Sequence, residues 1–136
     1  MSFTRLHPTA ALLPGRLRKN LLAGFLAGLG SYLFASLGDT WGQGTYFQDM
    51  ASTEAWPWFV IVGAIAVTAP CLIDAVLRAT LAMTLMVCGY YLLGSGIELQ
   101  GNRDAFFAWG AVALTAVPLT ATMAYGIKYA AGRLLR

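Results

Sequence analysis

The sequence predicts an all-α integral membrane protein: a single domain, residues 1–136, that forms a bundle of four transmembrane helices with both termini in the cytoplasm. Of its residues, 58% are hydrophobic and only 11% are charged, whereas a soluble domain carries about 25% charged residues. Four stretches contain no Asp, Glu, Lys or Arg and have the length of about 20 residues that a membrane-spanning helix needs. Most basic residues outside these stretches fall on one predicted side and most acidic residues on the other, which predicts the side on which each connection lies.

The first predicted span covers residues 20–38 and follows a basic leader at residues 1–19. Small residues recur along this span at intervals of three and four, and such spacing lets two helix backbones approach closely. We predict that a second helix packs here, either within the same bundle or from another protein or copy. The predicted packing residues are Gly24, Gly28, Gly30 and Ser31.

The second predicted span covers residues 55–73 and begins at Trp56 and Trp58, as expected at a membrane interface. A predicted outer loop at residues 39–54 joins it to the first span and contains no basic residue. Exposed aromatic side chains make good anchors for a binding partner. The predicted docking residues in this loop are Trp41, Tyr46 and Phe47.

The third predicted span covers residues 77–97 and the fourth covers residues 105–127, with Pro118 predicted to kink the fourth. Polar residues at intervals of three and four form a stripe on one face of the third span, and a weaker stripe follows the fourth. These hydroxyls either tie the two helices together or line a polar groove between them. The stripe residues are Thr80, Thr84, Cys88, Tyr91, Ser95, Thr115 and Thr122.

The turn between the second and third spans carries two opposite charges, Asp74 and Arg78. They are four residues apart, so a helical backbone would bring the side chains within reach of each other. We interpret them as a clamp at the inner turn. The alternative is a cytoplasmic gate or a latch for a partner.

The distribution of charge predicts the orientation. Eight of the nine basic residues, but one of the six acidic residues, fall in the leader, in the turn between the second and third spans, and after the fourth span. The positive-inside rule places that side in the cytoplasm and the protein in the cell (inner) membrane as a multi-pass protein. Within the leader, Arg16, Arg18 and Lys19 are predicted to contact anionic lipid headgroups.

The sequence lacks the residues that several classes of function need. His7 is the one histidine of the chain, and Cys71 and Cys88 lie at different predicted depths, so no haem, zinc or disulfide site is expected. Apart from Arg78 at the inner edge of the third, the predicted spans hold no charged residue for ion-coupled transport. The sequence also shows no phosphate loop or catalytic set. We therefore expect no enzymatic activity, no cofactor or metal, and no nucleic-acid partner.

Three functional hypotheses follow. The first is a non-enzymatic accessory subunit or modulator that acts by helix packing with another membrane protein or with itself. The second is a homo-oligomeric channel or carrier for a neutral or lipid-like solute, lined by the polar stripe. The third is a membrane immunity protein against a pore-forming toxin. Four spans and this length occur in unrelated groups of membrane proteins, so they identify no family.

Overall fold

The computed structural model describes residues 14–50, 54–93 and 103–135, and these residues form helices and turns without a strand. Three helical segments are long and apolar enough to cross a membrane: Gly15–Trp41, Leu72–Leu93 and Arg103–Leu134. The chain is therefore an all-α, multi-pass membrane protein. In chain order, the helices are α1 (Pro14–Trp41), α2 (Tyr46–Gln48), α3 (Trp56–Thr68), α4 (Leu72–Leu93), α5 (Arg103–Leu114) and α6 (Ala116–Leu134).

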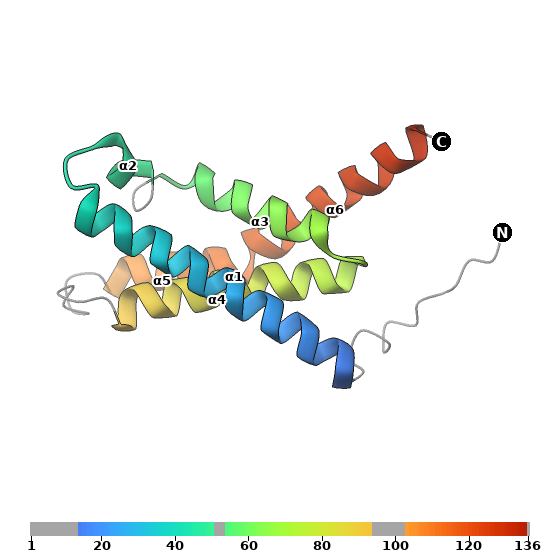
Figure 1. Cartoon of the computed structure of the whole chain (residues 1–136), viewed down its shortest axis with the longest axis horizontal. Helices are drawn as coiled ribbons and strands as arrows, with labels where there is room; N and C mark the ends of the chain where they lie inside the picture. Colours follow the sequence, from blue (N-terminus) through green and yellow to red (C-terminus); the bar gives the residue numbers. More distant parts are fainter. Residues whose placement is uncertain (1–13, 51–53, 94–102, 136) are drawn as a thin grey trace.

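Helix α4 is the centre of the bundle and contacts α1, α3, α5 and α6 (Figure 1). The start of α1, the α3–α4 turn and the second half of α6 lie at one end, which we call the polar end. The α1–α2 turn and the starts of α3 and α5 lie at the opposite end, which we call the aromatic end (Figure 1). Successive long helices therefore run in opposite directions.

Helix α1 begins earlier than predicted, at Pro14 rather than at residue 20. Proline suits the first helical position because its missing N–H would have no partner there. The described part of the basic leader is consequently helical. At the other end, the Gly42 amide donates to the carbonyl oxygens of Leu37 and Gly38 at 3.3 and 3.0 Å, and the chain turns through Gly44 with φ of +72°. Gly44 thus supplies a backbone angle that other residues rarely adopt.

Helix α3 is shorter than the predicted span of residues 55–73, because it ends at Thr68. Pro70 explains the difference: a proline disfavours helical angles in the preceding residue, and Ala69 is extended, with φ of −73° and ψ of 147°. The chain re-enters a helix at Leu72, before the predicted start at residue 77. Residues 94–97 of the predicted third span lie outside the described residues.

The fourth predicted span, residues 105–127, is interrupted at Thr115 and divides into α5 and α6. Thr115 has φ of −122° and ψ of −67°, outside the helical range. The cause is Pro118, which has no N–H for the carbonyl of Leu114 and whose ring would clash with it. The structure thus agrees with the predicted kink, and α6 continues beyond residue 127 to Leu134.

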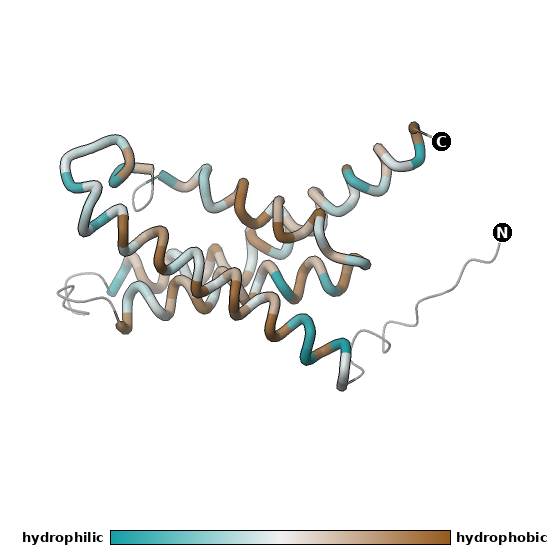
Figure 2. Tube along the Cα trace, in the orientation of Figure 1, coloured by the Kyte–Doolittle hydropathy of each residue, from teal (hydrophilic) through white to brown (hydrophobic). Residues whose placement is uncertain are grey.

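The core is built mainly from alanine, valine and methionine side chains between α4 and its neighbours. Val62 of α3 and Val117 of α6 are buried against it, and Trp58 closes the core near the aromatic end. Small residues on α4 let these helices approach closely, as in other membrane bundles. Figure 2 shows hydrophilic residues near both ends of α1 and at the polar end of α4 and α6, with hydrophobic residues further along these helices, as expected for helices that cross a bilayer.

Candidate functional site

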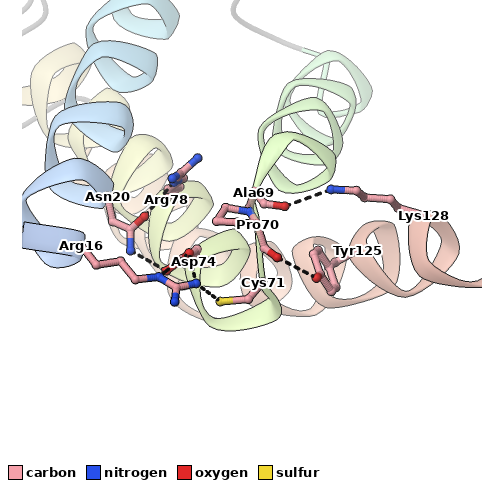
Figure 3. A network of polar contacts seen from close by, with 9 residues as sticks. All are labelled: Arg16, Asn20, Ala69, Pro70, Cys71, Asp74, Arg78, Tyr125 and Lys128. Atoms are coloured by element: carbon pink, nitrogen blue, oxygen red, sulfur yellow. Dashed lines mark hydrogen bonds and ion pairs between the residues drawn. The ribbon is translucent and has the colours of Figure 1, made fainter. Parts of the chain in front are cut away.

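The polar end contains a network of charged and hydrogen-bonding side chains centred on Asp74. This carboxylate is completely buried. Arg16 donates to it from Nε, at 2.9 Å to Oδ2, and from Nη2, at 2.6 Å. Asn20 donates from Nδ2 to Oδ1 at 2.6 Å. Figure 3 shows these residues with the other members of the network, which we call the polar cluster: Arg16, Asn20, Cys71, Asp74 and Arg78.

Asp74 and Arg78 do not form the predicted clamp with each other; each side chain binds a residue of α1 instead. Asp74 forms its ion pair with Arg16, and Arg78 donates from Nε to Oδ1 of Asn20 at 2.8 Å. The reason is the early start of α1, which places Arg16 one helical turn before Asn20 and on the face that packs against α4. Arg16 also donates from Nη2 to Cys71 Sγ at 2.8 Å.

The polar cluster carries a net positive charge. It contains two guanidinium groups and one carboxylate, so the formal sum is +1. Both helices that supply these charges are candidate membrane spans, and the charged residues lie in their first two turns, before the charge-free stretches that begin at Asn20 and Ala79. Charged side chains in membrane-spanning helices are costly, and they mark candidate functional positions.

Two side chains of α6 complete the polar end, and the sequence analysis did not identify either. Tyr125 donates from its hydroxyl to the carbonyl of Pro70 at 3.2 Å, and Lys128 donates from Nζ to the carbonyl of Ala69 at 3.0 Å (Figure 3). The last carbonyls of a helix lack partners within the helix. Tyr125 and Lys128 therefore stabilise the turn that Pro70 creates.

The predicted packing residues of the first span divide between two faces of α1. Gly24, Gly28 and Ser31 are buried. A Cβ atom on Gly24 would lie 2.8 Å from Leu81, and one on Gly28 would lie 2.9 Å from the Ala82 carbonyl oxygen. Gly30 is exposed, and a Cβ atom there would meet nothing within 4 Å. Gly30 therefore does not pack within the bundle, because two residues turn a helix by about 200°.

The polar stripes of the third and fourth predicted spans do not share one groove. Thr80 and Thr84 lie beside α1, and Tyr91 lies at the aromatic end with its ring centroid 5.9 Å from that of Phe106. Thr115 and Thr122 are exposed and donate to carbonyl oxygens one turn earlier in the same chain segment. Such bonds tie a hydroxyl to its own helix. Cys88 is partly buried, and Ser95 lies outside the described residues.

The aromatic end is held by edge-to-face ring contacts. The Phe34 ring centroid lies 5.3 Å from that of Phe47 and 5.9 Å from that of Trp58. Of the predicted docking residues, Phe47 is therefore engaged within the molecule, whereas Trp41 is 86% exposed and Tyr46 is 68% exposed. Of the three predicted docking residues, Trp41 and Tyr46 are therefore the two that are exposed.

No group of three or more metal-ligating side chains occurs within residues 14–50, 54–93 and 103–135. The chain matches no known protein family, curated protein or solved structure. Its function is therefore argued from the geometry alone. The polar cluster can fix α1 on α4, and its excess positive charge can attract an anion, because Coulomb attraction is stronger beside the low-dielectric interior of a protein or bilayer than in bulk water.

Proposed function

We propose that the chain crosses the cell (inner) membrane four times, with both termini in the cytoplasm. Helix α3 has 13 residues, a length of about 20 Å, and we propose that the turn after it completes the crossing. The alternating helix directions and the basic residues at the polar end support this topology. The polar end would then face the cytoplasm.

Cysteine labelling tests this topology. In a chain whose Cys71 and Cys88 are replaced by serine, Gln43→Cys reports on the aromatic end and Ala130→Cys on the polar end. We expect a membrane-impermeant maleimide to label Gln43→Cys in intact cells and Ala130→Cys only after lysis. Labelling of both positions from the same side would contradict the four-span topology.

We further propose that the protein is a non-enzymatic accessory subunit or modulator that packs against another membrane protein. The observation that carries the proposal is the division of α1 into two faces. Its small residues pack on α4. Large apolar residues on the opposite face are exposed at intervals of four, three and four, the spacing of a helix–helix seam. This exposed leucine face consists of Leu22, Leu26, Leu29 and Leu33.

The position of α1 in the bundle makes this face accessible. Helix α1 packs chiefly on α4, and its leucine face points away from that helix. The core between α3, α4 and α6 is filled by side chains, which favours an interaction role over passage of a solute through the bundle. The regular spacing of these leucines suits ridges-into-grooves packing against a helix of another protein.

Photocrosslinking in the native membrane tests the proposal. A photoreactive residue is placed at Leu26 or Leu29, with Leu119 and Met123 as matched exposed positions on α6. We expect a discrete protein adduct at Leu26 and Leu29 but not at the α6 positions. An adduct of two copies of this chain would favour the homo-oligomeric channel or carrier, and an adduct with a toxin would favour the immunity protein. Lipid adducts alone at all four positions would contradict a partner on α1.

A further inference from the structure

Beside the polar cluster, α1 and α4 leave a groove of about 240 Å³ that is open on one side. We call it the α1–α4 groove. Its walls are almost entirely apolar, with two hydroxyl-bearing residues on the α4 side. The lining side chains include Leu17, Leu21, Leu77, Thr80, Leu81 and Thr84.

The groove connects directly with the polar cluster through Asn20, which lines it and bonds to both Asp74 and Arg78. Within the described residues, Arg78 uses only its Nε atom in the cluster, and the end of its guanidinium group points away from Asp74 (Figure 3). Arg18 is exposed and follows Leu17 at the same end of the groove. An apolar channel thus ends at an excess of positive charge.

The groove also contains an unsatisfied polar atom. The Thr80 hydroxyl oxygen is buried and has no hydrogen-bond partner among the described residues. A buried hydroxyl without a partner costs free energy. The atom does not face the open groove, but rotation about the Thr80 Cα–Cβ bond would let it donate to an acceptor oxygen of a molecule bound there, and this would remove that cost.

We propose that the α1–α4 groove binds one acyl chain of an anionic phospholipid from the surrounding membrane leaflet. The phosphate lies near Arg78 and Arg18, and the Thr80 hydroxyl donates to an ester carbonyl of the lipid. The rest of the acyl chain lies along Leu21 and Leu81. This lipid site is independent of the proposed protein partner, because the leucine face of α1 is on another side of the helix.

Size, shape and charge favour this occupant. Sites that enclose a whole small molecule measure roughly 300–1,000 Å³, so a smaller open groove fits one part of a longer molecule. Its apolar walls suit hydrocarbon, and lipid is the hydrocarbon that surrounds these helices. Basic residues at a membrane surface attract anionic headgroups. A zwitterionic lipid would fill the groove without matching the charge.

The first test compares two lipids with the same acyl chains, phosphatidylglycerol and phosphatidylcholine. The full chain is purified in mild detergent and examined by native mass spectrometry and by thermal unfolding with each lipid added. We expect one retained phosphatidylglycerol and a larger rise in the unfolding temperature with this lipid than with phosphatidylcholine. Equal retention and equal stabilisation by both lipids would overturn the proposal.

Three variants locate the site. Thr84→Phe should fill the groove and abolish retention, and Thr80→Val should weaken retention while preserving side-chain volume. Arg18→Gln should lower the preference for phosphatidylglycerol about fivefold, the equivalent of about 1 kcal/mol for one basic residue near a membrane surface. The control is Arg133→Gln, which removes the same charge from α6 and should preserve the preference. If Thr84→Phe does not fold, lipid retention by Thr80→Val and lipid preference of Arg18→Gln decide whether the groove is the binding site. Unchanged retention and selectivity in all folded variants would place the lipid elsewhere.

Discussion

Two of the contacts that hold helix α1 on α4 have different physical origins. At the polar end, Arg16 and Asn20 bind the buried carboxylate of Asp74. One and two turns further along, Gly24 lies against the side chain of Leu81 and Gly28 lies against the backbone of Ala82. The first contact depends on charge and direction, and the second depends on shape alone.

This difference determines how each contact responds to change. In a buried ion pair, the cost of desolvating two charges nearly cancels their Coulomb attraction, so the net contribution to stability is small. Removing one partner is nevertheless strongly destabilising, because the other charge stays buried and unpaired. A glycine contact is stabilised by van der Waals packing over the whole seam, and it fails gradually as volume is added. The polar cluster therefore fixes the position of α1 along α4, and the glycines determine how closely the two helices approach.

The largest effect is expected for Asp74→Ala. The substitution leaves Arg16 beside a buried cavity without its carboxylate and raises the formal charge of the polar cluster from +1 to +2. Removing one partner of a buried ion pair costs about 3–5 kcal/mol. We expect the free energy of unfolding, measured by denaturant titration in detergent, to fall by that amount.

Two further variants sharpen this measurement. Asp104→Ala removes the same charge from an exposed position in the first turn of α5, and we expect a loss below about 1 kcal/mol. Adding Arg16→Met to Asp74→Ala removes the unpaired charge, so it should recover part of the lost stability. Equal effects of Asp74→Ala and Asp104→Ala would show that the polar cluster does not hold α1.

The glycine contact could be predicted from the sequence, and the ion pair could not. Small residues four apart define one helix face whatever the rest of the chain does, and Gly24 and Gly28 indeed lie against α4. Gly30 has a different angular position on the same helix and does not lie against α4. The aromatic loop likewise indicated an exposed surface but could not reveal that Phe47 packs on Phe34.

The partner of Asp74 depends on contacts that no local pattern encodes. Arg16 lies 58 residues away in the chain, while Arg78 lies one helical turn away, so local spacing favoured the wrong pair.

Two prolines in the sequence indicate where helices begin or end. Pro14 indicates an early start of α1, and Pro70 indicates that a continuous second span cannot run to residue 73. The roles of Tyr125 and Lys128 depend on that turn and had no signal of their own.

The smallest effect, and the one that separates the two faces of α1 most clearly, is expected from Gly28→Ala compared with Gly30→Ala. The added methyl group on Gly28 would lie 2.9 Å from the carbonyl oxygen of Ala82 and from Cβ of Leu85. The two helices must move apart, because backbone cannot yield as a flexible side chain can. Overpacking of this kind costs about 1–3 kcal/mol, so denaturant titration should show a less stable protein.

Gly30→Ala adds the same methyl group two residues further along, where it would meet nothing within 4 Å. Alanine favours the helical backbone over glycine by up to about 1 kcal/mol, so this variant should be equally or more stable than the natural protein. The two substitutions share their chemistry and their helix, and they differ only in the face they occupy. If Gly28→Ala lowers the free energy of unfolding and Gly30→Ala leaves it equal or raises it, α1 packs on α4 through one face in the purified protein. A loss of stability of the same size at Gly30 would instead place a second helix, from another copy or a retained partner, on the leucine face.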